Sequence, residues 1–229
     1  MVARLRGRGD ERRAGTEVTL EVRRGEGEVR VLRLRRALLD SQQVVAERLD
    51  GGVLRVTVRA FTSGVADRVR AVLRAAHTGV VLDLRGNSGG LVDEAAGTAG
   101  IFLDGGPVGS YQERGGTREL TAPRGGDQRT PLVVLVDGGT MSAAELLAGA
   151  LQDRSRAVVV GARTFGKGTV QQPSRLADGA VLEMTVGRYY TPAGRSPEGT
   201  GLAPDVPAAT GEDADALALR VLAGLGTRT

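Results

Sequence analysis

Two runs of mainly apolar residues, 79–84 and 131–137, each lead into a turn that contains a pair of glycines. Runs of this length and composition are typical of strands that are covered on both faces of a sheet. Each turn is followed by a helical pattern, over residues 91–102 and 142–152. Because strands and helices alternate through residues 53–161, we predict an α/β fold.

The remaining elements follow from shorter patterns. Polar and apolar residues alternate over 17–24 and 29–35, which predicts a small β-rich hairpin in front of the α/β core. After a polar stretch at 40–52, residues 63–76 are predicted to form an amphipathic helix with Ser63 as its N-cap. We also predict strands at 53–59, 157–161, 169–176 and 180–190, a loose surface hairpin within 105–130, and a surface helix at 212–225.

Composition excludes several kinds of site. The chain has 229 residues, 41% of them apolar, and no cysteine, so disulfides and thiolate metal sites are excluded. The single histidine, His77, cannot form a standard zinc site alone, and we expect it to be solvated or at the edge of the core. The sequence shows no signal peptide and no apolar run of about twenty residues.

The net charge of +4 comes from arginine, and many of the arginines lie within residues 4–36. Such a segment could bind nucleic acid or an anionic membrane. However, acidic residues interrupt the charge, and the segment has no aromatic side chains on which bases could stack. We therefore expect no nucleic-acid partner.

Lys167 is the only lysine among 31 basic residues. The chain uses arginine for its other cations, so the retained ammonium suggests a task that a guanidinium cannot perform. Arginine stays protonated, whereas a lysine removed from water can become a neutral amine and act as a general base. Codon bias is the other explanation for a single lysine.

Ser142 stands at the start of a predicted helix, at the edge of the sheet where α/β proteins bind ligands. As an N-cap it would only satisfy free amides. As a nucleophile it would gain from the helix dipole and nearby N–H donors, and Lys167 could supply the base of a Ser-Lys dyad. Gln171 lies four residues after the lysine, on the same face of an extended segment, and could hold the amine or be a plain surface residue.

Three segments resemble the signature of the carboxyl-terminal processing proteases, the tail-specific serine peptidases of S41 type. They read Val-Leu-Asp-Leu-Arg-Gly-Asn-Ser-Gly-Gly (81–90), Val-Asp-Gly-Gly-Thr-Met-Ser-Ala-Ala-Glu-Leu-Leu-Ala-Gly-Ala-Leu-Gln-Asp (136–153) and Gly-Ala-Arg-Thr-Phe-Gly-Lys-Gly-Thr-Val-Gln (161–171). The resemblance extends in order from about residue 15 to residue 207.

The resemblance implies that Ser142 is the nucleophile, that Lys167 is the general base and that Gln171 orients the lysine. It places the oxyanion hole at the backbone N–H groups of Gly90 and Ala143. Two acidic residues of the same motif, Glu145 and Asp153, receive structural or supporting roles. Asp153 is eleven residues from the nucleophile along a helix, or roughly 16 Å, which is too far for direct participation.

The resemblance also implies a ClpP/crotonase-like α/β peptidase core that works by acyl transfer without metal or cofactor. The expected partners are proteins or peptides with apolar C-terminal tails, and the expected location of the full-length protein is the cell envelope or outside the cell. We expect three parts: a partial PDZ domain at 1–36, with only the end of that domain present, a catalytic domain at 37–210, and a helical tail at 211–229.

Two alternative functions remain open from the sequence. Residues 161–169 nearly match the phosphate-binding pattern G-x-x-x-x-G-K-[ST], although Gly168 stands where Ser or Thr should bind magnesium. A strand-like segment also follows where that motif requires a helix. The chain could otherwise be a non-catalytic protein-binding scaffold, with the dyad present but not assembled.

Overall fold

The computed structural model describes residues 2–6, 15–23, 25–37, 42–113, 115–209 and 211–226. The chain divides into two compact units, Met1–Ser41 and Gln42–Thr229. In the first, β1 (Val2–Arg6), β2 (Glu17–Arg23) and β3 (Arg30–Arg35) form an antiparallel sheet, which confirms the predicted hairpin. Part of the arginine-rich segment, at 7–14 and 24, lies outside the described residues. The identity of this unit as a partial PDZ domain remains a prediction.

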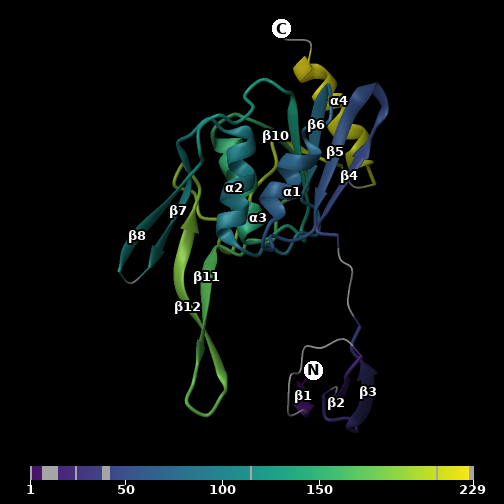
Figure 1. Ribbon diagram of the computed structural model, residues 1–229, viewed down its shortest axis with the longest axis vertical. Helices are drawn as coiled ribbons and strands as arrows, with labels where there is room; N and C mark the ends of the chain where they lie inside the picture. Colours follow the sequence, from purple (N-terminus) through teal and green to yellow (C-terminus); the bar gives the residue numbers. More distant parts are fainter. Residues whose placement is uncertain are drawn as a thin grey trace. The chain divides into compact units, whose positions relative to one another are not determined.

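The second unit is built on a six-stranded sheet with the order β13-β10-β9-β6-β5-β4 (Figure 1). Five strands run parallel, and β4 pairs antiparallel with β5 at one edge. Every residue of β6 and β9 is buried, as expected for strands covered on both faces. The predicted α/β fold is confirmed. The strands are β4 (Val44–Arg48), β5 (Val53–Val58), β6 (Gly79–Asp83), β9 (Leu132–Val136), β10 (Val158–Gly161) and β13 (Val206–Pro207).

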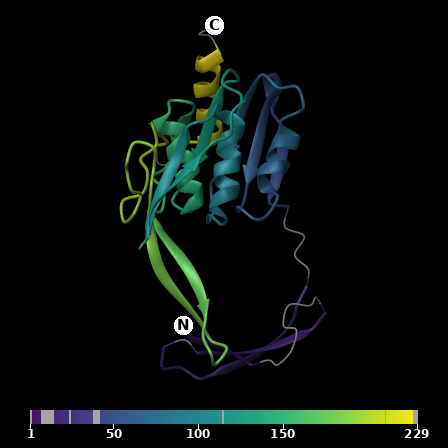
Figure 2. The same ribbon diagram turned by 60° about the vertical axis from the view of Figure 1, so that its left-hand side comes forward.

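Helices cover both faces of this sheet (Figures 1 and 2). Three of them, α1 (Val65–Val72), α2 (Val92–Phe102) and α3 (Ala143–Asp153), pack on one face, where alternate strand residues such as Leu82 and Val134 meet them. The opposite face carries α4 (Ala214–Gly226). The side chains of β6 and β9 alternate between these two cores because successive strand residues point to opposite faces.

The first helix of the sheet unit does not begin as predicted. The N-cap of α1 is Gly64, with φ 82° and ψ 8°, and not Ser63. Glu94 on α2 supplies the missing acceptor: its carboxylate takes hydrogen bonds from the N–H groups of Gly64 at 2.8 Å and Ala66 at 2.9 Å. A neighbouring helix therefore satisfies amides that local sequence patterns assign to a nearby serine.

Two segments contribute more than their patterns suggested. The polar stretch at 40–52 contains β4 and a 3-10 turn at Asp50–Gly52, so it extends the sheet. The predicted surface helix, α4, buries Leu217, Ala218 and Leu222 against β6, β9 and β10. Its apolar side is thus part of the protein core. None of the described helices is long and apolar enough to cross a membrane.

A second sheet of the same unit has the order β11-β12-β7-β8 and is antiparallel. Its strands are β7 (Pro107–Glu113), β8 (Gly116–Thr121), β11 (Thr169–Arg175) and β12 (Val181–Tyr190). The hairpin predicted within 105–130 is present as β7 and β8. Only residues 187–190 of β12 pair with β7, so the rest of the β11–β12 hairpin projects as a two-stranded ribbon (Figure 2).

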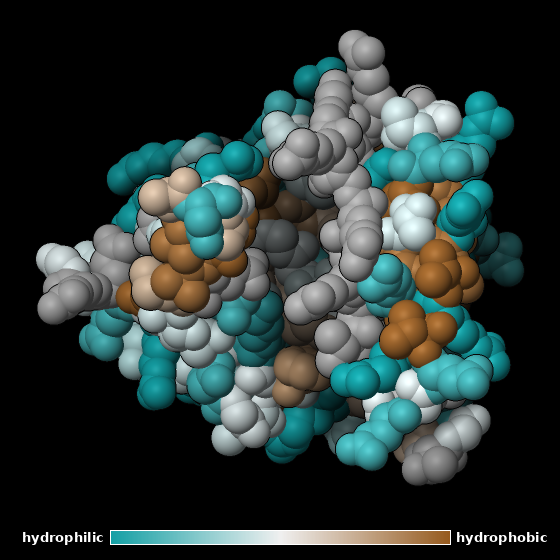
Figure 3. All heavy atoms as spheres, turned by 90° about the horizontal axis from the view of Figure 1, so that it is seen from below, coloured by the Kyte–Doolittle hydropathy of each residue, from teal (hydrophilic) through white to brown (hydrophobic). Residues whose placement is uncertain are grey.

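The projecting hairpin exposes apolar side chains. Leu182 and Met184 on β12 are 43% and 44% exposed. Apolar side chains gather in patches on the face of the molecule that Figure 3 shows. A two-stranded ribbon of this kind gains little stability from its own contacts. The ribbon begins two residues after Lys167, so its base lies next to the candidate active site.

Candidate active site

Two turns at the carboxyl ends of β6 and β9 meet in the folded chain. The N–H of Met141 donates to the carbonyl oxygen of Asn87 over 2.9 Å. The N–H of Gly86 donates to Asp137 Oδ1, also over 2.9 Å. The two glycine-containing turns therefore form one unit at the edge of the sheet where α/β proteins bind ligands.

Ser142 has a strained backbone, with φ 58° and ψ −122°. A residue other than glycine in such a region costs on the order of 1–3 kcal/mol and persists only where its surroundings enforce it. Here the preceding residue, Met141, is bonded to Asn87, and the N–H of Ser142 donates to Glu145 Oε2 at 2.9 Å. The half-buried serine immediately precedes α3, at the positive end of the helix dipole.

Glu145 is fully buried, and its carboxylate accepts four hydrogen bonds. Oε1 accepts from the hydroxyl of Thr164 at 2.5 Å and from the N–H of Gly166 at 2.8 Å. Oε2 accepts from the N–H groups of Ser142 and Lys167, both at 2.9 Å. One oxygen thus holds the backbones of both predicted dyad residues. Because each backbone nitrogen lies 2.9 Å from this oxygen, the two nitrogens can be no further apart than twice that distance.

The loop that carries the lysine, residues 162–168, is fastened at further points. The N–H of Phe165 donates to the carbonyl oxygen of Thr140 at 3.0 Å. The N–H of Gly168 donates to Glu198 Oε2 at 2.6 Å. The first bond ties the loop to the turn before Ser142, and the second ties it to the segment that follows β12. The backbone position of Lys167 is therefore determined by contacts on both sides.

The side chain of Lys167 is half-buried and forms no hydrogen bond or ion pair with the described residues. In particular, no hydrogen bond joins its Nζ atom to Ser142 Oγ in this part of the chain. The structure therefore brings the two residues together through their backbones.

Gly90 and Ala143 each have an N–H group that donates to no acceptor in the described ranges. Gly90 has φ 131°, and a Cβ atom at this position would collide with the carbonyl oxygen of Phe61. A Cβ atom on Gly89 would lie 2.9 Å from Ser142 Cβ and 3.2 Å from the nitrogen of Ala143. Only glycine allows so close an approach, which places both free N–H groups beside the serine.

The other predicted site residues occupy different surroundings. Gln171 is exposed on β11, and among the described residues its side chain forms no hydrogen bond, including with Lys167. The Asp153 carboxylate, at the far end of α3, accepts the N–H of Ala193 at 2.8 Å and pairs with Arg195. Asp153 therefore stabilises the turn after β12.

Two residues of the site were not identified from the sequence. Asn87 is fully buried: its Nδ2 donates to the carbonyl oxygen of Val58 at 2.9 Å, and its Oδ1 accepts the N–H of Gly89 at 2.8 Å. It lies within the motif at 81–90, which could have drawn attention to it. Glu198, which holds the lysine loop, lies in an irregular segment with no pattern to indicate its role.

A cavity of about 380 Å³ begins directly after Gly90. Its walls are the start of α2 and the face of the antiparallel sheet that carries Tyr111 and Tyr189. The two rings meet edge to face at 6.1 Å, and burial raises the pKa of Tyr189 to about 12. The cavity is lined by Leu91, Val92, Asp93, Glu94, Tyr111, Arg118, Val170 and Tyr189.

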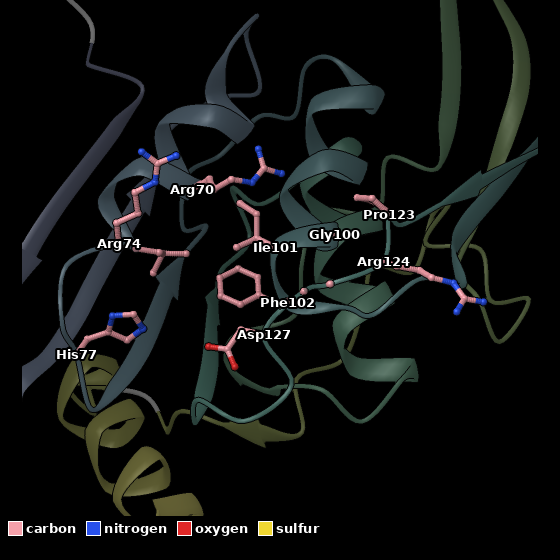
Figure 4. Close-up of a pocket in the computed structure, with 12 residues that line it drawn as sticks. Arg70, Arg74, His77, Gly100, Ile101, Phe102, Pro123, Arg124 and Asp127 are labelled. Atoms are coloured by element: carbon pink, nitrogen blue, oxygen red, sulfur yellow. The ribbon is translucent and has the colours of Figure 1, made fainter.

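A second cavity, of about 410 Å³, contains none of the predicted site residues. It lies between the C-terminal ends of α1 and α2 and the loop after β8, with Arg70, Arg74 and His77 at its rim (Figure 4). The His77 ring bonds through Nδ1 to the carbonyl oxygen of Ala75 at 2.6 Å. Across the described part of the chain, no three His, Cys, Asp or Glu residues are placed to hold a metal ion.

Comparison with known proteins identifies relatives of this arrangement. A carboxy-terminal-processing protease of Bartonella bacilliformis is 34% identical over 205 residues, covering 84% of this chain and 47% of the relative. Carboxy-terminal processing protease CtpA of Bacillus subtilis is 33% identical over 214 residues, covering 90% and 45%. The chain thus spans less than half the length of these two relatives.

A solved structure and a family description agree with these relatives. The photosystem II D1 C-terminal processing protease has a TM-score of 0.67 and 32% identity, covering 85% of this chain and 56% of that one. The sequence model of peptidase family S41 matches residues 51–208, and this range includes every predicted site residue. Because this match covers more than half of the chain, the chain belongs to peptidase family S41.

Proposed function

We propose that the chain is the catalytic part of a serine endopeptidase that cleaves proteins near their C-termini with a Ser-Lys dyad. The observation that carries this proposal is the position of Glu145, whose Oε2 atom accepts N–H groups from both Ser142 and Lys167. A hydroxyl and the only primary side-chain amine of the chain are thereby held at one site. Membership of family S41 supports the same reading.

In the proposed reaction, neutral Lys167 removes the proton of Ser142 Oγ as the oxygen attacks a substrate carbonyl carbon. The carbonyl oxygen becomes an oxyanion and is stabilised by the N–H groups of Gly90 and Ala143. The resulting ammonium then protonates the departing amine as the peptide bond breaks. Water, deprotonated by the same amine, hydrolyses the acyl-serine and regenerates the hydroxyl.

The absence of a direct bond between the hydroxyl and amine is compatible with this role, because catalytic hydrogen bonds often tighten only when substrate is bound. Gln171 would then orient the amine from β11 once the lysine moves toward the serine. Glu145 and Asp153 act at a distance from the reacting atoms, the first through the two backbones and the second through the turn after β12.

The phosphate-loop alternative is disfavoured by the loop's surroundings. The N–H of Gly168, which a phosphate would need, already donates to the carboxylate of Glu198 at 2.6 Å. Thr169 begins a strand, whereas the phosphate loop leads into a helix. We therefore favour peptide hydrolysis, with substrates that carry apolar tails and, for the full-length protein, a place outside the cytoplasm.

The test is cleavage of a fluorescent protein that ends in an apolar tail, followed by mass spectrometry of the products. Ser142→Ala and Lys167→Arg should each lower kcat by a factor of at least about 1,000, as expected for groups that act as a unit. Arg163→Lys, an exposed exchange of cations in the same loop, is the matched control and should retain activity. Normal cleavage by Lys167→Arg would show that the lysine is not the base.

A further inference from the structure

The outer edge of β11 pairs with no other strand among the described residues. This strand is the last in the order β11-β12-β7-β8, and it begins at Thr169, two residues after Lys167. An unpaired strand edge presents N–H and C=O groups on which an extended peptide can add as a further strand. The question is which groups of β11 point outward.

Two hydrogen bonds, one at each end of the hairpin, fix the orientation of its backbone. The N–H of Tyr189 donates to the carbonyl oxygen of Gly168 at 2.7 Å. The N–H of Leu176 donates to the carbonyl oxygen of Ala180 at 2.8 Å. The pairing shifts by one residue between Val170 and Gln171, and the extra residue, Val186, lies on β12. Alternation along β11 is therefore unbroken, and even-numbered residues from 168 to 176 direct their backbone groups toward β12.

The odd-numbered residues of β11 consequently face outward. Thr169 and Gln171 have N–H and C=O groups on this edge that bond to no group in the described part of the chain, as does Arg175 further along. Pro173 lies between them and has no N–H to donate, in agreement with the outward position that proline takes on edge strands. Strand addition next to the lysine is therefore limited to Thr169 and Gln171.

The same strand forms part of the cavity beside Gly90. Val170 lies on the sheet face that carries Tyr111 and Tyr189, and all three side chains line the 380 Å³ space. A peptide paired with this edge would place one side chain beside Val170 and the next on the opposite face. Leu91, which is 52% exposed, forms the wall nearest the free N–H of Gly90.

We infer that the outer edge of β11, at Thr169 and Gln171, binds the substrate as an extended fifth strand and inserts one apolar substrate side chain beside Val170. This inference rests on the proposed function. Backbone pairing supplies affinity for a chain of any sequence, and the cavity selects one side chain. The paired segment leads to Lys167, so the bond to be cut is held between the amine and Ser142.

Peptide binding can be measured without turnover. The protein is residues 1–229 with Ser142→Ala, and the ligand is a fluorescein-labelled octapeptide of alanine and valine. Adding Thr169→Pro, which removes an outward N–H, should raise Kd about threefold to tenfold, the effect of one lost hydrogen bond. Arg175→Pro removes an outward N–H beyond Pro173 and should leave Kd within about twofold. Equal effects of the two prolines, or no measurable binding by the Ser142→Ala protein, would overturn the inference.

A second measurement needs no further change to the protein. The octapeptide is N-methylated at one amide at a time, and we expect every second methyl group to raise Kd while the intervening ones have little effect, since alternate amides face the partner strand. Uniform effects would contradict strand addition. Cleavage by the parent chain separates the two proposals: if Ser142→Ala abolishes cleavage but methylation shows no alternation, only the strand inference fails.

Discussion

At the scale of single residues, α3 carries two carboxylates that have different tasks. Glu145 is buried and joins the backbones of Ser142 and Lys167. Asp153, two turns further along the helix, pairs with Arg195 and supports a turn. Both belong to one sequence motif, and only their contacts in the folded chain separate their roles.

We expect Glu145→Gln to lower kcat on the order of 100-fold, because an amide nitrogen cannot accept the N–H bonds that align the dyad residues. The free energy of unfolding should also fall by about 1–3 kcal/mol. The matched control is Asp153→Asn, which should lower stability while changing kcat only a few-fold. Kinetics and denaturant unfolding of both variants test this, and an equal fall in kcat would contradict the assigned roles.

Gly90→Ala should abolish most activity, because its Cβ atom would collide with the carbonyl oxygen of Phe61 and displace the N–H group that we propose for the oxyanion hole. Gly86→Ala is the comparison: Gly86 has φ 66° and no atom within 4 Å of an added Cβ. That change should cost only the strain of a left-handed residue, about 1 kcal/mol, with little effect on kcat.

Tyr189 offers a spectroscopic test of the cavity beside Gly90. Burial raises its pKa to about 12, so absorbance followed with rising pH should show a tyrosinate step near pH 12. The unfolded chain releases this proton near pH 10, earlier than the folded chain, so stability should decline as pH rises from about 10 to 12. Tyr189→Phe should remove the late absorbance step; its persistence would assign the step to another tyrosine.

At the scale of elements, α4 covers one face of the six-stranded sheet. Its Asp215 accepts hydrogen bonds from Arg55 at 2.9 Å and from Arg85 at 3.0 Å, which links the helix to β5 and to the turn before Gly90. Asp83 holds the same Arg85 guanidinium, whose pKa these carboxylates raise. The helix lies beyond residue 208, where the match to family S41 ends.

The contribution of α4 can be measured with Leu222→Ala. This side chain is 4% exposed and packs against the sheet, so its loss should lower the free energy of unfolding by about 2–4 kcal/mol. Leu182→Ala, on the projecting hairpin where the side chain is 43% exposed, should change it by less than about 0.5 kcal/mol. A similar loss of unfolding free energy in both variants would show that the Leu182 side chain is buried in solution.

At the scale of the whole molecule, the chain consists of two units: Met1–Ser41, with one described sheet, and Gln42–Thr229, with two. The two clusters of buried apolar residues both lie within the second unit. The division predicted from the sequence, after residue 36 and again after residue 210, remains a prediction, as does the assignment of the first part to a PDZ domain.

Because the buried core lies in the second unit, a chain of residues 42–229 should unfold at a denaturant midpoint close to that of the full chain. Its unfolding transition should remain cooperative. Circular dichroism during urea titration of both chains provides the measurement. A large fall in the midpoint would show that the first unit stabilises the second.

The sequence alone predicted the features that depend on neighbouring residues: the buried strands, the glycine turns and most helices. It also singled out Ser142 and Lys167, whose pairing as nucleophile and base remains a proposal. Only the tertiary structure decided which distant groups complete them. Glu94 caps α1 in place of Ser63, Glu145 joins two residues 25 positions apart, and α4 covers a sheet face. The physical reason is that periodicity and turn chemistry act over a few residues, whereas these contacts depend on the order and direction of strands in the sheet.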